Sequence, residues 1–405
     1  MRSKLVMCFG LLLWLGCAKG GGRSMSPHFV SEPVYVTKTN PVKVYAHYMP
    51  WFENSADGRW GMHWTMATAD PNAVDADGKR QIAAHFYPLI GPYSSSDPDL
   101  IEYHLLLMKL AGIDGVLIDW YGTHDVYDYR ANKRNAEALV EHLPEVGLDF
   151  AIVYEEFTAE HVAKAQMADS ELAAAKADLR YMQSAYFAHD RYIRVGGAPL
   201  LLAFGPRFFK TPGEWAQIFA EIDPLPHFLL LWHQAMDAGN WATGEFAWVG
   251  KGHFETLDRF YRDRVPELQT AMAAVYPGFR DYYREGGWGD GLGWSIHHEE
   301  GATLAATLER AGRSGLPFLQ LVTWNDFGEG TMIEPTRRFG FSFLVQVQAF
   351  TGVDFTEADL ELVYALYQAR KRHGTDRVMQ AELDQVYRCI VSLRLEEAAG
   401  LLQEL

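Results

Sequence analysis

Hydrophobic residues along the chain follow two alternating patterns from about residue 41 onward. Short, nearly continuous apolar runs are typical of strands buried on both faces, and recurrence every three or four positions is typical of amphipathic helices. The apolar runs predict eight strands, at 42–50, 115–122, 150–156, 199–206, 227–234, 245–250, 270–278 and 318–326. Helical patterns between the runs include 98–110, 132–143, 171–188, 214–222 and 303–311. Eight strands alternating with helices predict a (β/α)8 barrel, an α/β fold, over residues 41–350.

Two insertions and a C-terminal appendage account for residues beyond a minimal barrel. Barrels of this type take roughly 250 residues. The excess falls at 53–96 and at 279–302, which both follow strands and are therefore expected at the C-terminal face of the barrel. Residues 351–405 predict two or three helices, with Thr356 at a plausible helix start, packed as a small appendage against the barrel.

The N-terminal segment has the pattern of an export signal. Two basic residues precede an apolar run at 5–15, which is too short to span a bilayer, and Gly16-Cys17 follows it. A small residue before a cysteine at this point resembles a bacterial lipobox. We therefore expect a signal peptide at 1–16, a lipid on Cys17, a tether at 17–40, and a lipoprotein anchored to a bacterial membrane, periplasmic or at the cell surface. An ordinary signal peptide cut nearby is the alternative.

The amino-acid composition argues against several classes of binding partner and cofactor. The 405 residues carry 36 Lys and Arg against 52 Asp and Glu, so the net charge is −16, and an acidic chain of this kind is not expected to bind nucleic acid. The three cysteines form no disulfide framework, since Cys8 leaves with the signal, Cys17 would be lipidated and Cys389 lies in a helical pattern as a buried thiol. No metal or cofactor is expected, because the cluster His297-His298-Glu299-Glu300 lacks the i, i+4 spacing of helix ligands.

Acidic and aromatic residues gather where the predicted strands end. In a barrel these ends meet at one rim, which is where active sites are built. Sugars offer apolar faces for stacking and hydroxyls for carboxylates and amides, so this combination favours a glycan cleft. Each Trp is equally compatible with a core position, Asp119 with a loop cap, and adjacent residues on a strand point to opposite sides. The predicted substrate-binding residues are Tyr48, Trp51, Asp119, Trp120, Tyr121, Glu155, Trp232, Trp324, Asn325 and Glu334.

The highest density of candidate catalytic residues lies at the end of the last predicted strand and directly after it. Asp326 and Glu329 are three residues apart in a segment that turns through two glycines, so both carboxylates can converge on one substrate. A closely spaced pair can keep one acid protonated and the other ionised, as acid/base catalysis requires. A calcium or structural loop is the alternative. We therefore predict Asp326 and Glu329 as the catalytic pair.

This segment resembles the strand-eight motif of glycoside hydrolase family 99, the endo-α-mannosidases and endo-α-mannanases. The family motif has the form Asn-Glu-Trp-His-Glu-Gly-Thr-x-Ile-Glu-Pro, and the chain has Asn-Asp-Phe-Gly-Glu-Gly-Thr-Met-Ile-Glu-Pro at 325–335. The start of the barrel, His-Tyr-Met-Pro-Trp-Phe at 47–52, is also similar to family 99. The segment further resembles family 71, the α-1,3-glucanases, so the chain looks most like the bacterial 71/99-like group.

The resemblance implies a barrel that cleaves internal α-mannosidic bonds with retention. In that family one carboxylate is described as a base on the sugar 2-hydroxyl, giving an anhydro-sugar, and a second as the general acid. By position, the resemblance assigns Asp326 the base role, Glu329 the acid role, and Glu155 and Tyr48 contacts near the 2-hydroxyl. The chain departs from the motif, because Asp326 is one CH₂ shorter than Glu and Phe-Gly at 327–328 replaces Trp-His.

The sequence thus predicts a glycoside hydrolase that degrades an α-linked polysaccharide or oligosaccharide, either an α-mannan or an α-glucan. Because the departures concern the residues nearest the reaction, the broader class of α-glycan follows more directly than α-mannan alone. A non-catalytic glycan-binding lipoprotein on a hydrolase-like barrel is the alternative, and a lyase or isomerase on the same barrel is a third hypothesis.

Overall fold

The computed structural model describes residues 33–54 and 57–405, and the predicted signal peptide and Cys17 lie outside these residues. Parallel strands pair in sequence order and close into a barrel, since β1 pairs with β9 and β3 with β5. The two-residue strand β4 (Arg194–Val195) is antiparallel to β5 and stands outside the barrel. The eight barrel strands are β1 (Lys43–Tyr48), β2 (Gly115–Trp120), β3 (Asp149–Tyr154), β5 (Ala198–Ala203), β6 (His227–Leu231), β7 (Gly244–Phe246), β8 (Thr270–Val275) and β9 (Phe318–Leu321).

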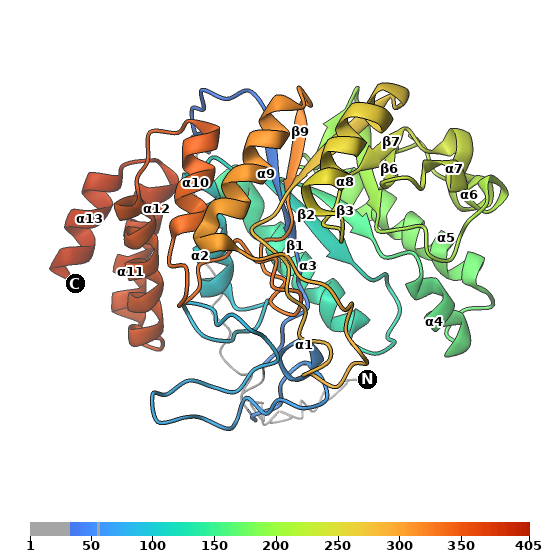
Figure 1. Cartoon of the computed structure of the whole chain (residues 1–405). Helices are drawn as coiled ribbons and strands as arrows, with labels where there is room; N and C mark the ends of the chain where they lie inside the picture. Colours follow the sequence, from blue (N-terminus) through green and yellow to red (C-terminus); the bar gives the residue numbers. More distant parts are fainter. Residues whose placement is uncertain (1–32, 55–56) are drawn as a thin grey trace, which may run out of the picture. The chain divides into compact units, whose positions relative to one another are not determined.

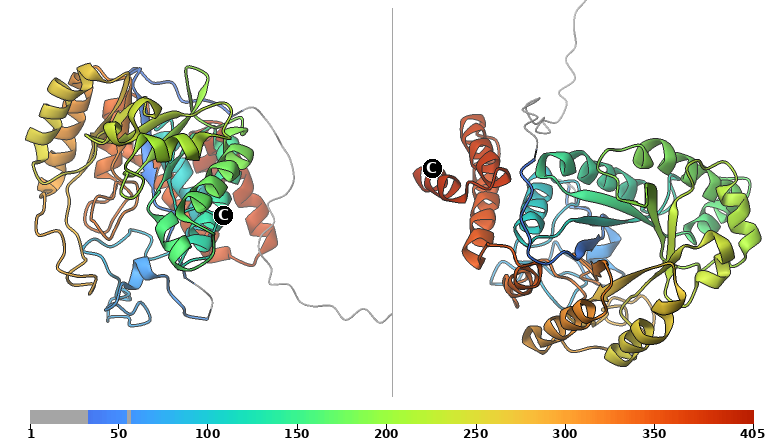
Figure 2. Two further views of the ribbon diagram at one scale, coloured as in Figure 1. Left: turned by 90° about the vertical axis from the view of Figure 1, so that its right-hand side faces the viewer. Right: turned by 90° about the horizontal axis from the view of Figure 1, so that it is seen from above.

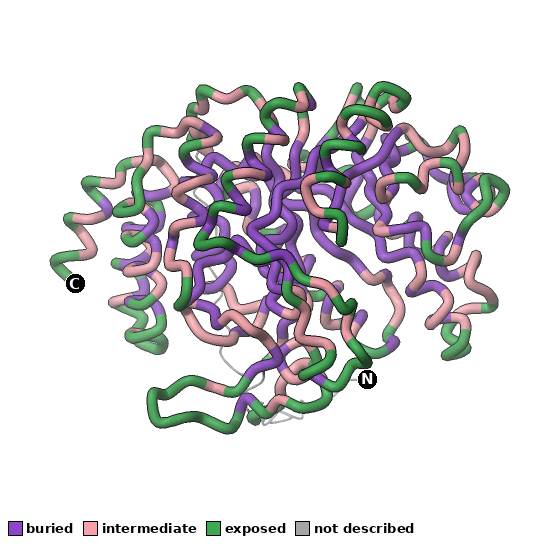
Figure 3. The backbone as a smooth tube through the Cα atoms, viewed as in Figure 1, coloured by how far each residue is buried: buried purple, intermediate pink, exposed green. Residues whose placement is uncertain are grey.

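Helices surround the barrel, as Figure 1 shows. The principal crossover helices are α2 (Pro98–Leu110), α3 (Tyr129–Val146), α5 (Glu171–Met182), α6 (Pro212–Phe219), α8 (His253–Arg259), α9 (Ala302–Arg313) and α10 (Ser342–Thr351). Shorter helices are α1 (Met62–Thr65), α4 (Thr158–Lys164) and α7 (Ala235–Ala238). The strands are buried along almost their whole length, so the core lies inside the barrel and between barrel and helices (Figure 3). The predicted (β/α)8 barrel is confirmed.

Local sequence explains where individual helices begin. Asp97 caps α2 by accepting the backbone N–H of Asp99, and Pro98 follows at the first helical position, where its missing N–H costs nothing. This helix coincides with the predicted one at 98–110. In α6, Thr211 and Glu214 form a reciprocal capping box, which moves the helix start two residues ahead of the prediction.

Three further helices, α11 (Glu357–His373), α12 (Arg377–Val391) and α13 (Leu395–Glu404), follow the barrel. The view along the barrel in Figure 2 shows them outside the ring of crossover helices. Helix α11 packs on α2, and the buried Arg370 donates to both carboxylate oxygens of Glu102 at 3.0 and 2.9 Å. Two insertions, 53–96 and 279–302, extend from the same end of the barrel, at the bottom of Figure 1.

Candidate active site

A cavity of about 210 Å³ opens at the carboxyl ends of the barrel strands. Its lining comes from the ends of β1, β2, β3, β5 and β7, from the turn after β9, and from both insertions. Since these ends converge in a (β/α)8 barrel, residues far apart in sequence share one space. The lining residues are His47, Met49, Trp51, Phe52, His63, Met66, Asp119, Tyr121, Glu155, Phe157, Phe204, Arg207, Trp248, Tyr283, Trp288, Asp326, Gly328 and Glu329.

Four carboxyl groups line this cavity: Asp119, Glu155, Asp326 and Glu329. Burial raises the pKa of Asp119 and of Asp326, and the charges of neighbouring carboxylates raise both further. Burial raises the pKa of Glu155 to about 8, although the charge of Arg207 opposes the shift. Carboxyl groups with raised pKa values retain protons near neutral pH, so the cavity holds proton donors as well as acceptors.

The turn after β9 brings Asp326 and Glu329 together. The Asp326 N–H donates to Thr323 Oγ1 at 2.8 Å, and Asp326 Oδ1 accepts the Glu329 N–H at 2.9 Å. Gly330 makes the turn possible, because its φ of +67° is unfavourable for other residues and an added Cβ would lie 2.9 Å from the Arg280 carbonyl oxygen. Both side chains line the cavity as a result.

Residues of the 279–302 insertion form hydrogen bonds with this turn. The backbone N–H groups of Arg280 and Tyr282 donate to the carbonyls of Glu329 and Gly328, each at 2.8 Å. The Tyr283 hydroxyl donates to Glu329 Oε1 at 2.7 Å. Burial raises the pKa of Glu329, and this hydrogen bond from Tyr283 partly opposes the shift. The insertion thus fixes the orientation of one carboxyl group that can exchange a proton with a bound ligand.

Adjacent residues at the end of β3 take different roles. Glu155 lines the cavity, and its Oε2 has no hydrogen-bond partner among the described residues. Glu156 is buried and accepts the backbone N–H groups of Arg207, Phe208 and Phe209. This contact fixes the loop after β5, so Arg207 is held at the cavity without a side-chain hydrogen bond in the described part of the chain.

Aromatic rings form much of the remaining wall. Trp51 and His63 stack with centroids 4.2 Å apart and planes 5° apart. On another part of the lining, Trp248 packs edge-on against His47 at 4.7 Å and against Phe204 at 4.8 Å. Flat apolar surfaces next to hydrogen-bonding carboxyl groups match the two kinds of surface that a sugar ring presents.

Half of the residues predicted for the site line the cavity. Those are Trp51, Asp119, Tyr121, Glu155, Asp326 and Glu329. The other six do not line it; they are Tyr48, Trp120, Trp232, Trp324, Asn325 and Glu334.

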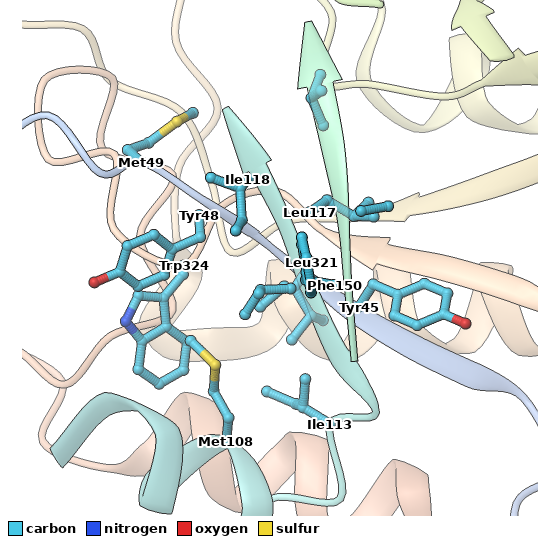
Figure 4. Close-up of a cluster of buried hydrophobic side chains, with 14 of the residues drawn as sticks. Tyr45, Tyr48, Met49, Met108, Ile113, Leu117, Ile118, Phe150, Leu321 and Trp324 are labelled. Carbon is cyan, nitrogen blue, oxygen red and sulfur yellow. The ribbon is translucent and has the colours of Figure 1, made fainter. Parts of the chain in front are cut away.

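Strand alternation explains the positions of two of these residues, Tyr48 and Trp120. His47 and Asp119 point into the cavity, so their neighbours Tyr48 and Trp120 point toward the surrounding helices. The Tyr48 hydroxyl lies 3.0 Å from Nδ1 of the buried His104 on α2, and Figure 4 shows Tyr48 among buried hydrophobic side chains. Trp120 stacks on Tyr181 of α5, at 5.9 Å. The structure therefore gives both aromatics packing contacts behind the barrel wall.

Three more of these residues are buried outside the cavity lining and contact the elements that form it. Asn325 accepts the Met49 N–H at 2.8 Å and donates to the Met49 carbonyl at 3.0 Å, which ties the end of β1 to the turn after β9. Glu334 accepts the Tyr93 hydroxyl at 2.6 Å. Trp324 is fully buried and packs edge-on against the ring of His104.

Trp232, the last of the six, lies away from both the cavity and the residues described above. It is partly buried, and its ring packs against Phe260 at 5.8 Å, away from the cavity lining.

Several lining residues were not among the predicted site residues, notably Arg207, Trp248, Tyr283 and Trp288. Arg207 directly follows the predicted strand at 199–206, and Trp248 lies within the predicted strand at 245–250 near its carboxyl end, so the same rule of strand ends could have identified them. Tyr283 and Trp288 lie in the insertion expected at this face, but no spacing in the sequence distinguishes them from other aromatic residues there.

Residues 40–223 match the family model described as Glycosyl hydrolase family 99. The chain is related to glycosyl hydrolase family 99. The match covers the barrel from β1 through α6 and includes the similar segment at 47–52, so it confirms the resemblance to this family, while the motif at 325–335 lies outside the matched residues.

Curated relatives and solved structures agree with this relationship. The glycoprotein endo-alpha-1,2-mannosidase of Mus musculus is 28% identical over 216 residues, which is 49% of this chain and 44% of that protein. That of Rattus norvegicus is 26% identical over the same length, with the same coverage. The chain thus aligns with less than half the length of these relatives.

Among solved structures, the GH99 endo-alpha-mannosidase from Bacteroides thetaiotaomicron superposes with a TM-score of 0.60 at 20% identity. The superposition covers 77% of this chain and 97% of that one. A structure described as a glycoside hydrolase-like protein gives a TM-score of 0.55 at 11% identity, covering 81% and 97%. These similarities establish the barrel fold.

Proposed function

We propose that this chain is a glycoside hydrolase that cleaves an α-linked glycan, with α-mannosides as the first substrates to test and α-glucans as the second. The observation that carries the proposal is the Asp326–Glu329 pair, held by one turn in a cavity with Asp119 and Glu155. Such a pair supplies the two groups that glycoside hydrolysis needs. The endo-alpha-mannosidase names of the relatives support the choice of sugar.

In the proposed reaction, Glu329 protonates the leaving oxygen. Its raised pKa keeps a proton available, and the Tyr283 hydroxyl holds Oε1 so that the carboxyl group has a defined direction. As the bond breaks, Glu329 becomes an anion, and the same hydroxyl stabilises that anion by a charge-assisted hydrogen bond.

Asp326 acts as the base in this proposal: it takes the proton of the sugar 2-hydroxyl, whose oxygen bonds to the anomeric carbon as the leaving group departs, and water then opens the anhydro-sugar. Asp326 accepts the Glu329 N–H through Oδ1, which leaves Oδ2 for the substrate. Since two neighbouring carboxylates cannot both ionise easily, the pair holds a proton between its members near neutral pH. Glu155, with Oε2 free of partners among the described residues, is placed to bind a sugar hydroxyl.

The experiment that tests the function is a product screen. Purified protein is incubated with α-mannans and α-1,3-glucans, products are separated by chromatography, and proton NMR follows the anomeric configuration. Release of sugars from one of these α-glycans supports the proposal. Affinity for a glycan without any product after long incubation would instead favour a binding protein.

We further propose that Cys17 carries a lipid that anchors the protein to a bacterial membrane. Support comes from the apolar run at 5–15 followed by Gly16-Cys17. Among the described residues, none of the helices combines the length and apolar character needed to cross a bilayer. Metabolic labelling with an alkyne fatty acid should mark the wild-type chain and not Cys17→Ala; equal labelling of both would contradict the anchor.

A further inference from the structure

Trp288 has an unusual position for so large an apolar side chain. It is 39% exposed, and it is the one Trp among the large exposed hydrophobic residues in the part of the chain that the structure describes. At the same time it lines the cavity. An indole that faces both solvent and a cavity rich in carboxyl groups is available to a ligand that enters the site.

The ring is held in place although its loop is rich in glycine. The backbone N–H of Trp288 donates to the Tyr283 carbonyl at 2.7 Å. The Trp288 and Tyr283 rings stack with planes 22° apart and centroids 6.2 Å apart. The Trp288 and His63 rings pack edge to face, with their centroids 6.0 Å apart. Contacts to rings of both insertions therefore fix one orientation of the indole.

The loop itself is docked onto the first insertion. The Ala67 N–H donates to the Gly286 carbonyl, and the Thr68 hydroxyl donates to the Glu285 carbonyl, both at 2.8 Å. Gly286 permits this close approach, because an added Cβ would lie 2.2 Å from Met66 Sδ. The segments around 66–68 and 285–288 thus form one wall of the cavity, with Trp288 on it.

Tyr283 connects this wall to the proposed acid. Its ring stacks on Trp288 while its hydroxyl donates to Glu329 Oε1. A sugar stacked on Trp288 is therefore close to the carboxyl group that protonates the leaving oxygen, which favours the leaving-group side of the scissile bond.

We propose that Trp288 is the stacking platform for the leaving-group sugar, and that it selects glycans that continue beyond the cleaved bond over substrates with a non-sugar leaving group. This inference rests on the proposed function. The apolar face of a pyranose packs on an indole, whereas a small leaving group such as fluoride cannot.

The kinetic test compares two substrates. An α-manno-oligosaccharide has a sugar leaving group, and the matching α-mannobiosyl fluoride does not. Trp288→Ala should raise KM for the oligosaccharide about tenfold and leave kcat/KM for the fluoride within twofold of wild type, and Trp288→Phe should restore most of the affinity. Tyr127→Ala, which removes an exposed ring outside the cavity, is the matched control and should change neither substrate. Equal effects of Trp288→Ala on both substrates, or none, would overturn the proposal.

A binding measurement separates this inference from the proposed catalysis. Titration calorimetry of the same oligosaccharide into Glu329→Gln, with and without Trp288→Ala, reports affinity without turnover. Loss of about tenfold in affinity on removing the indole supports the platform even if wild type cleaves neither substrate. Equal affinity of both variants, or no binding to Glu329→Gln, would refute it.

Discussion

Single residues in the cavity are distinguished by what their side chains contact. Glu155 and Glu156 are adjacent and chemically identical, but only Glu155 lines the cavity, and its Oε2 has no hydrogen-bond partner in the described structure. Glu156 uses both oxygens to bind backbone N–H groups after β5. Glu155 is therefore available to bind a ligand, whereas Glu156 holds the loop after β5 in place.

The raised pKa of Glu155 predicts a pH-dependent cost to stability. Because the folded state holds the proton up to about pH 8, whereas an unfolded Glu releases it near 4.5, the free energy of unfolding falls as pH rises between these values. Glu155→Gln removes the titration. At pH 8.5 the variant should melt at least about 2 °C higher than wild type, and the difference should shrink toward pH 4.5. Differential scanning fluorimetry across this range measures it; a constant difference would contradict the assignment.

The sequence predicted residue positions at the site only in part. Its rule of strand ends placed Asp119, Glu155, Asp326 and Glu329 at one rim, and all four line the cavity. The alternation of strand faces was stated but not applied to the end of β2, so Trp120 was grouped with Asp119 although the two point to opposite sides. Aromatic residues satisfy a buried helix-facing position as well as a cleft, which is why composition alone did not separate these two environments.

At the scale of elements, the barrel strands and most helices were predictable because their periodicity is local. The eight strands fall at the predicted runs, including the three-residue β7. The insertions were predictable only as extra length, since their structure depends on contacts across 66–68, 285–288 and the turn after β9. The contacts between 66–68 and 285–288 join segments more than 200 residues apart, and those between the second insertion and the turn after β9 join residues more than 40 apart, so no short-range pattern encodes them.

The turn after β9 should be sensitive to any side chain at Gly330. Alanine there meets both an unfavourable φ of +67° and the backbone oxygen of Arg280 at 2.9 Å. We expect Gly330→Ala to lose more than about tenfold in kcat/KM, because a shift of the turn moves both carboxyl groups. Gly340→Ala is the matched control, with a φ of +52° and no atom within 4 Å of the added Cβ. Similar activity of the two variants would contradict this role of the turn.

At the scale of the whole molecule, the C-terminal helices are joined to the barrel by a buried charge pair. Arg370 is fully buried and forms a two-pronged contact with Glu102 of α2, and it also donates to Asp384 of α12 at 2.8 Å. Such a contact makes α11 and α12 part of the cooperative unit that includes the first crossover helix, on the outside of the ring in Figure 2.

Removing one partner of this pair should destabilise the protein. Arg370→Met removes the two-pronged hydrogen bond to the buried Glu102 carboxylate, and breaking a buried charge pair of this kind is expected to cost about 3–5 kcal/mol in the free energy of unfolding. Arg372→Met changes an exposed Arg on the same helix and should cost less than about 0.5 kcal/mol. Urea denaturation followed by circular dichroism measures both. Equal stability of the two variants would show that the pair does not join the appendage to the barrel.

The central claim is that the Asp326–Glu329 pair performs the cleavage, and one measurement tests it most directly. Initial rates of product release from the α-glycan that wild type cleaves are compared for wild type, Glu329→Gln and Glu285→Gln, with melting temperatures recorded alongside. Glu285 lies on the same insertion wall, but its carboxylate is half exposed and outside the cavity lining. The account predicts that Glu329→Gln keeps its fold and loses at least about a hundredfold in kcat, while Glu285→Gln stays near wild type. A folded Glu329→Gln protein with full activity would contradict it.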